Sequence, residues 1–181
     1  MAIEKVRERL LRSTAALESG GIPYAVIGGH AVAVWVARID EDAVRNTADV
    51  DLLLNRVDLL RAKAALEAAG FEQADVHGVT MFLEKDNPNP RRGIRIVFAG
   101  EKVRPHEPHP APVLSEPERA IDGFAVIDLK SLLVMKLTAN RDKDRTHIRE
   151  LLELNMITPE LESQLPDDLK ARLEAIRATP E

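Results

Sequence analysis

The sequence contains no cysteine, and that absence excludes disulfide cross-links, thiolate metal sites and a cysteine nucleophile. Aromatic residues make up only 3% of the chain, too few to build platforms on which single-stranded nucleic-acid bases stack. The longest apolar run, from Ala31 to Ala37, is far shorter than the roughly 20 residues that a membrane-spanning helix needs. These absences predict a cytoplasmic protein without a membrane segment, whose chemistry uses carboxylate, histidine, lysine or hydroxyl groups.

Charge and length further restrict the class of protein to which the chain can belong. The 181 residues include 25 lysines and arginines against 30 aspartates and glutamates, a formal charge of −5. This acidity disfavours extended nucleic-acid binding, because clustered basic residues bind the phosphate backbone. With 45% hydrophobic residues, the chain is long enough to bury a substantial core. Its charged N-terminus lacks a following apolar stretch, so we expect no secretory signal peptide.

The first half of the chain alternates helical and strand patterns. Apolar residues at helical spacing from Ile3 to Leu17 predict an amphipathic helix, which Gly20 and Gly21 end. Two short apolar segments predict buried strands, and a helical pattern follows each of them. The expected elements are a strand at 24–27, a helix at 30–38, a strand at 49–54, and a helix to residue 69 that Asp58 caps and Gly70 ends.

The second half predicts a hairpin, an extended crossing and a helical end. Strand candidates at 79–83 and 94–99 are joined by a turn-rich stretch, and the proline-rich segment 105–117 predicts an extended path without regular pairing. After a short strand at 124–127, Asp128 is placed to cap a helix at 129–139, with further helices at 144–154 and 167–177. We therefore expect an α/β protein of the α+β type. A small mixed sheet flanked by helices spans 1–127, and a C-terminal helical region, 128–181, packs on it.

The strongest chemical signal is the pair Asp49 and Asp51 at the start of the second predicted strand. Residues i and i+2 of a strand point to the same face, so both carboxylates enter one site. Adjacent carboxylates repel each other unless a cation neutralises them, and their hard oxygens suit Mg²⁺, with Mn²⁺ as the second choice. A pair of solvated acids at a strand end is the alternative explanation for so short a motif.

A glycine pair predicts an anion site nearby. Gly28 and Gly29 lie between the first strand and its helix, where glycine lets the backbone approach a ligand closely. Free N–H groups at the start of the helix favour a bound phosphate, and His30 there either contacts a phosphate or bonds a backbone carbonyl. The spacing matches neither the dinucleotide fingerprint nor the phosphate loop that ends in Gly-Lys-Ser/Thr, so a plain tight turn is the alternative.

The strand, the glycine pair, the helix and the segment Arg45-Asn46-Thr47-Ala48-Asp49-Val50-Asp51 together resemble the nucleotidyltransferase superfamily, and within it the small enzymes related to polymerase β. The segment 128–144 is similar to the C-terminal helical segment of that group. The resemblance implies that Gly28 and Gly29 face a triphosphate, that Asp49 and Asp51 are the catalytic residues and metal ligands, that Arg45 and Thr47 hold or line the loop, and that Lys136 approaches the nucleotide. From the residues alone, Lys136 is equally well explained as a solvated lysine on an amphipathic helix.

One departure from the family pattern concerns a third carboxylate. The family usually places this acid on a later strand, after an arginine and a hydrophobic residue, but here Arg95-Ile96 is followed by Val97. The loss implies a changed mechanism, a substitute acid such as Glu101 or Glu84, or a protein that binds without catalysing.

Two functions follow from the resemblance. The first is a metal-dependent nucleotidyltransferase that moves a nucleoside monophosphate from a nucleoside triphosphate to a hydroxyl on a small molecule, protein or RNA. The second is a catalytically impaired member that binds a nucleotide or a partner protein of the antitoxin kind, since relatives of this type resemble resistance enzymes and toxin components. A dinucleotide-binding fold is a third interpretation, which the segment 45–51 fits poorly.

Overall fold

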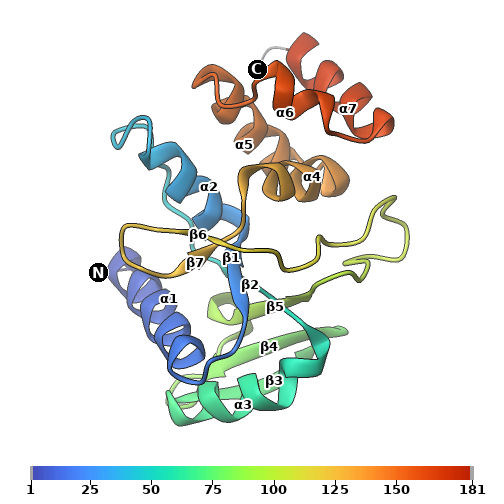
Figure 1. Ribbon diagram of the computed structural model, residues 1–181. Coiled ribbons are helices and arrows are strands. Elements are labelled where there is room, and N and C mark those ends of the chain that lie inside the picture. Colours follow the sequence, from blue (N-terminus) through green and yellow to red (C-terminus); the bar gives the residue numbers. More distant parts are fainter. Residues whose placement is uncertain (1, 180–181) are drawn as a thin grey trace.

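The computed structural model describes residues 2–179 and shows a seven-stranded mixed sheet with helices around it (Figure 1). The strands lie in the order β3-β4-β5-β2-β1-β7-β6. At the centre of the sheet, β2 runs parallel to β5 and antiparallel to β1. The expected mixed sheet is therefore confirmed. Its strands are β1 (Tyr24–Ile27), β2 (Val50–Leu54), β3 (Phe71–Val76), β4 (Val79–Glu84), β5 (Ile94–Phe98), β6 (Glu118–Arg119) and β7 (Ala125–Val126).

The helices cover the sheet and form the C-terminal region. Helices α1 and α3 pack against each other (Figure 1). Helix α2 contacts the strands β1 and β2 and also the helices α4 and α5. A single cluster of buried apolar side chains includes residues of the sheet and of α4, α5 and α7. The division after residue 127 stays a prediction. The helices are α1 (Ala2–Ser19), α2 (Gly28–Ala37), α3 (Leu59–Ala68), α4 (Leu129–Ala139), α5 (Asp142–Glu153), α6 (Pro159–Ser163) and α7 (Asp167–Ala178), with 3₁₀ turns at Arg56–Asp58 and Pro90–Arg92.

The predicted helix signals are confirmed at some ends and wrong at others. The Asp128 carboxylate accepts a hydrogen bond from the Ser131 backbone N–H at 2.9 Å and so caps α4, as expected. Asp58 caps nothing with its side chain, because a 3₁₀ turn precedes α3 and the Asp58 carboxylate bonds the side chains of Asn55 and Arg61 instead. Helix α2 begins at Gly28 rather than at residue 30, so the glycine pair forms its first turn.

The predicted hairpin of β4 and β5 is confirmed, and a further strand, β3, was not expected from the sequence. The sequence of Phe71–Val76 contains several polar residues, so its hydrophobic pattern does not indicate a strand. The turn that joins it to β4 carries a signal, because His77 and Gly78 have φ values of 53° and 78°. Two successive positive φ angles are typical of the two-residue hairpin turn.

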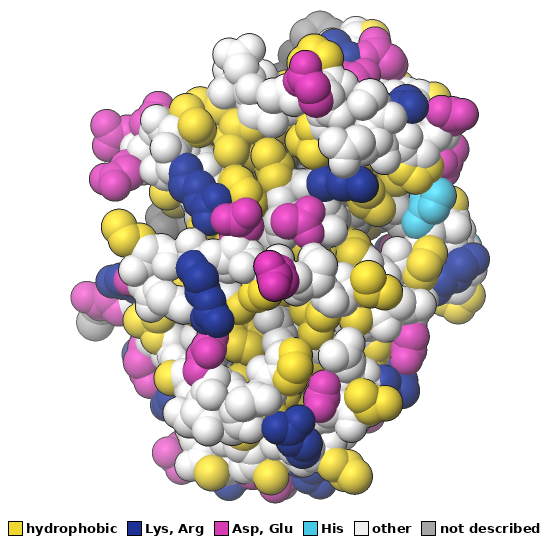
Figure 2. All heavy atoms as spheres, in the orientation of Figure 1, with side chains coloured by type: hydrophobic (Ala, Val, Ile, Leu, Met, Phe, Trp, Pro, Cys, Tyr) yellow, Lys and Arg dark blue, Asp and Glu magenta, His cyan; other side chains and the backbone are white. Residues whose placement is uncertain are grey.

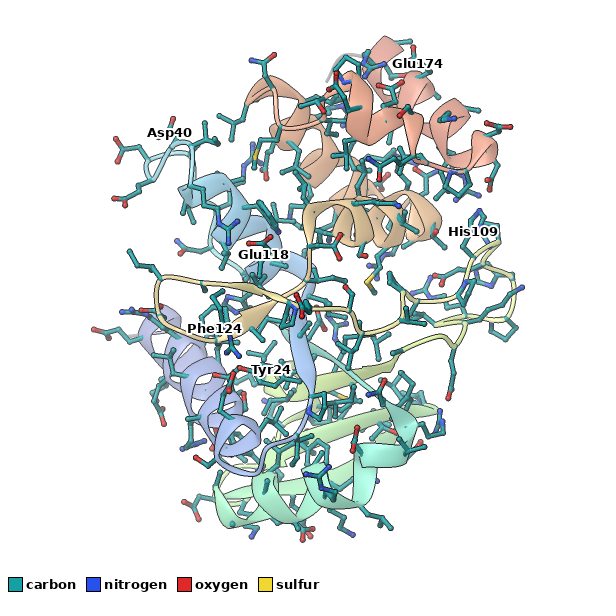
Figure 3. All side chains as sticks on the ribbon, viewed as in Figure 1. Tyr24, Asp40, His109, Glu118, Phe124 and Glu174 are labelled. Atoms are coloured by element: carbon teal, nitrogen blue, oxygen red, sulfur yellow. The ribbon has the colours of Figure 1, made fainter. Side chains whose placement is uncertain are left out.

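The proline-rich segment connects β5 to β6 without helix or strand between residues 99 and 117, as expected. His109 lies on this segment, and its Nε2 is 2.8 Å from Oδ2 of Asp168 at the start of α7 (Figure 3). Near the other side of the sheet, the Tyr24 hydroxyl donates to Glu18 at 2.9 Å and accepts from the Ala125 N–H at 3.1 Å. These contacts tie the crossing segment to α7, and β1 to α1 and β7.

The surface carries charges of both signs. Figure 2 shows basic and acidic side chains interspersed on the face turned to the viewer, without a broad basic patch. Among residues 2–179, no helix combines the length and the apolar character that crossing a bilayer requires.

Candidate functional site

The candidate acids lie where β2 meets β1 and β5. Asp51 is the second residue of β2, and its cross-strand neighbours are Ile27 of β1 and Arg95 of β5. Asp49 immediately precedes β2, and the carboxylates of both acids contact the same guanidinium group, that of Arg95. Because Ile27 is the last residue of β1, the turn into α2 begins directly beside Asp51.

The glycine pair lies against Asp51 of this couple and against Thr47. Gly28 has a φ of +69°, and a Cβ atom built there would be 2.3 Å from Oδ2 of Asp51. At Gly29, a Cβ atom would be 2.6 Å from Oγ1 of Thr47. Any side chain at these two positions would displace the acid or the threonine. The structure therefore brings together four of the predicted site residues around the first turn of α2.

Arg95 appears in the sequence pattern only as the arginine before the missing acid, and its contact with both acids was not predicted. Its Nε donates to Oδ1 of Asp51 at 2.7 Å, and its Nη2 lies 3.1 Å from Oδ2 of Asp49. The Lys143 ammonium, from α5, adds a contact of 3.3 Å to the same Asp49 oxygen. Burial raises the pKa of Asp51 above its ordinary value, and the positive charge of Arg95 opposes that shift.

Among the residues that the structure describes, no third carboxylate joins the pair. Val97 pairs with Leu53, two residues further along the strands than the pair of Asp51 and Arg95. Among residues 2–179 there is no cluster of three acidic or histidine side chains suited to a metal ion. The two suggested substitutes bind arginines elsewhere, Glu84 pairing with Arg9 and Arg12 of α1, and Glu101 with Arg56.

The donor set nevertheless fits one magnesium ion. Mg²⁺ is typically held by one or two carboxylates, while substrate phosphates and water complete its coordination. Asp49 and Asp51 supply two carboxylates whose side chains are 36% and 16% exposed, so ligands can reach them. Residues 2–179 provide no third acid beside them for a second ion.

Lys136 is buried and is therefore not the solvated lysine that the sequence allowed. Its Nζ donates to Oδ1 of Asp144 at 3.0 Å and to Nδ1 of His147 at 2.9 Å. Arg141 also donates to Asp144, through Nε at 2.6 Å. Burial lowers the pKa of Lys136, and the negative charge of Asp144 partly offsets the effect. The Lys136 ammonium therefore lies inside an ionic network between α4 and α5.

The remaining predicted residues lie around α2 and α5. Arg45 forms an ion pair with Glu150 of α5. A small cavity beside them is lined by α2 together with Thr47, Lys143 and His147. Nε2 of His30 is buried and has no hydrogen-bond partner among residues 2–179. Burial lowers the pKa of this histidine to about 4.

The neutral state of His147 predicts acid sensitivity. Burial and the neighbouring Lys136 charge lower the pKa of His147 to about 4, below its ordinary value of 6.5. The unfolded chain therefore binds this proton more readily, and the free energy of unfolding falls as the pH drops from about 6.5 toward 4. We expect His147→Gln to remove about 2 kcal/mol of the stability difference between pH 8 and pH 5, measured by urea unfolding. The exposed His106→Gln should leave that difference unchanged, and an equal effect of both variants would contradict the assignment.

No known family model matches the chain, and no curated protein is similar enough in sequence to match it. Solved structures do share the fold. An antigenic nucleotidyltransferase-like protein from Paracoccidioides brasiliensis superposes with a TM-score of 0.60 at 17% identity, over 97% of this chain and 88% of that one. The antibiotic-resistance factor ANT(2'')-Ia in solution gives a TM-score of 0.52 at 12% identity, over 98% and 91%. The same factor in complex with adenylyl-2''-tobramycin gives 0.52 at 11%, over 92% and 94%.

The chain therefore has the nucleotidyltransferase fold. These similarities confirm the expected resemblance at the level of architecture. At such low identities the match shows how the chain folds, and its activity has to be argued from its own site.

Proposed function

We propose that this protein is a metal-dependent nucleotidyltransferase, which moves a nucleoside monophosphate from a nucleoside triphosphate to a hydroxyl on a small molecule, protein or RNA. The proposal depends on the direct contact between Asp51 and the glycine turn, where a Cβ at Gly28 would overlap the carboxylate. A cation site and a helix start that attracts anions thus adjoin each other, as a metal-bound triphosphate requires. One structural neighbour is described as nucleotidyltransferase-like, and another was solved in complex with adenylyl-2''-tobramycin, which supports the same kind of reaction.

The local charges also suit a polyphosphate. Although the whole chain has a charge of −5, four acids around the site are matched by five basic residues. The acids are Asp49, Asp51, Asp144 and Glu150, and the basic residues are Arg45, Arg95, Lys136, Arg141 and Lys143. The surroundings of the acid couple are therefore much less acidic than the chain as a whole, and their basic residues can contact a ligand with several negative charges.

In the proposed reaction, the acceptor oxygen attacks the α-phosphorus, and the bond from that phosphorus to the oxygen shared with the β-phosphate breaks. Pyrophosphate leaves, and the hydroxyl proton passes to solvent. Mg²⁺ or Mn²⁺ held by Asp49 and Asp51 would neutralise phosphate charge. The backbone at Gly28 and Gly29 orients the triphosphate, and Lys143 faces it with an exposed positive charge.

The test is transfer of label from an α-labelled nucleoside triphosphate to an acceptor in the presence of Mg²⁺. We expect Asp49→Ala with Asp51→Ala to reduce transfer at least about 100-fold, because the metal ligands are lost. The matched control is Asp40→Ala with Asp42→Ala, which removes two exposed acids of the same spacing and should leave transfer unchanged. Transfer that survives loss of the couple removes these residues from the mechanism.

A second candidate function is favoured by the arginine at the site. Arg95 contacts both acids, and no third carboxylate lies with them among residues 2–179. A protein of this kind binds a nucleotide or an antitoxin-like partner protein without transferring anything. Calorimetry separates the two, because nucleotide binding that needs Mg²⁺ but releases no pyrophosphate with any acceptor supports this second candidate. In either case we place the protein in the cytoplasm, consistent with its lack of cysteine.

A further inference from the structure

Arg95 occupies the position next to Asp51 on the neighbouring strand. Its backbone is fixed in the sheet, since residue 95 pairs with Asp51 of β2 on one side and with Met81 of β4 on the other. Its side chain is 38% exposed, so the guanidinium group can move while the strand stays in place. The position is thus built to bring one basic group to the acid couple.

The guanidinium group divides its donors between the two acids. Nε reaches Oδ1 of Asp51 at 2.7 Å, and Nη2 reaches Oδ2 of Asp49 at 3.1 Å. A planar fork of this kind can hold two carboxylates at once, which a lysine ammonium does less well. Arg95 therefore satisfies the same oxygens that a metal ion would use.

The charges around the couple cancel before any metal binds. Asp49 and Asp51 contribute two negative charges, and Arg95 and Lys143 contribute two positive ones. A divalent cation that approaches this neutral group meets the repulsion of both basic heads, whereas one that arrives with a triphosphate brings its own compensating charge.

We infer that Arg95 is the resident counter-ion of the acid couple and competes with the divalent metal for it, so that metal binds weakly alone and tightly only together with a nucleoside triphosphate. The inference rests on the proposed function in taking Asp49 and Asp51 as metal ligands. Arg95 acts here as a positioning residue. It keeps the two acids together without a metal and leaves them when metal and nucleotide arrive.

The experiment measures Mn²⁺ binding to the full chain at pH 7 without nucleotide, by calorimetry and by the electron paramagnetic resonance of free Mn²⁺. Arg95→Gln is expected to tighten binding at least about tenfold, because the competing charge is gone. Arg95→Lys should fall between the two. The control Arg92→Gln removes an exposed charge just before β5 and should leave binding unchanged.

Nucleotide supplies the second measurement. In the wild type, a non-hydrolysable nucleoside triphosphate should tighten Mn²⁺ binding more strongly than in Arg95→Gln. If Arg95→Gln fails to fold, Arg95→Lys carries the test, because it loses the fork that holds both acids and should still bind Mn²⁺ more tightly than the wild type.

The outcomes separate the inference from the proposed function. Mn²⁺ binding that is equal or weaker in Arg95→Gln overturns the role of Arg95 while the metal site stands. Mn²⁺ binding by none of the variants, with or without nucleotide, contradicts the metal site itself and the inference with it. Tighter binding in Arg95→Gln that Asp49→Ala abolishes supports both.

Discussion

Gly28→Ala is expected to destabilise the protein by about 2–4 kcal/mol and to weaken Mn²⁺ binding in the presence of nucleotide at least about tenfold. Two separate costs add up at this position. The φ of +69° is unfavourable for any residue with a side chain, and the new Cβ would lie 2.3 Å from Oδ2 of Asp51. The turn or the carboxylate must move, and either movement separates the acid from the start of α2. Urea unfolding and calorimetry measure the two effects.

A second glycine separates backbone strain from steric conflict. Gly21 has a φ of +59°, and a Cβ built there meets nothing within 4 Å. Gly21→Ala should therefore cost only about 1–2 kcal/mol, the price of the left-handed backbone, and leave ligand binding intact. Equal effects of the two substitutions would show that the approach of Gly28 to Asp51 has no particular importance.

The parts of the site that the sequence predicted are local in the chain. Asp49 and Asp51 reach the same guanidinium group because they are two residues apart in extended chain at the start of β2, and Gly28 follows directly from the end of β1. Only one longer connection, the pairing of β1 with β2, was needed to bring them together. Strand alternation and turn chemistry act over a few residues, so patterns of that length carry this information.

The part that the sequence could not predict depends on register between distant strands. Arg95 follows Asp51 by 44 residues, and it reads as one more basic residue near a turn. Its role arises from the parallel pairing of β2 with β5, which places residue 95 opposite residue 51. A shift of one residue in that register would turn Arg95 to the other face of the sheet. The alternation of apolar residues along β5 fixes the face on which Arg95 lies, but it does not identify Asp51 of β2 as the neighbour of Arg95.

The burial of Lys136 in α4 could not be predicted from local sequence either. Its spacing on α4 is compatible with a solvated position, yet it is only 5% exposed. The burial follows from the packing of α4 on α5, which supplies Asp144 and His147 as partners. A lysine is rarely buried without such partners, so its environment is decided by tertiary structure and not by helical period.

Asp144→Ala is expected to cost about 3–5 kcal/mol of unfolding free energy, because it leaves the Lys136 ammonium buried without its carboxylate. Asp144 is 1% exposed and accepts from Lys136 at 3.0 Å and from Arg141 at 2.6 Å. The control lies two residues away on the same helix. The side chain of Asp142 is 96% exposed and pairs only at the surface, so Asp142→Ala should cost less than about 1 kcal/mol.

A double variant tests whether the cost comes from the stranded charge or from the lost packing. Adding Lys136→Met to Asp144→Ala removes the buried charge and keeps an apolar side chain of similar length, so part of the lost stability should return. Loss of Asp144 also lowers the pKa of Lys136 further, since the raising influence of that carboxylate is gone. The unfolded chain then takes up the proton more readily, and the single variant should lose additional stability as the pH falls from 10 toward 7, an effect absent from the double variant. A double variant no more stable than Asp144→Ala, with the same pH dependence, would mean that the lost stability comes from packing and not from a buried Lys136 charge.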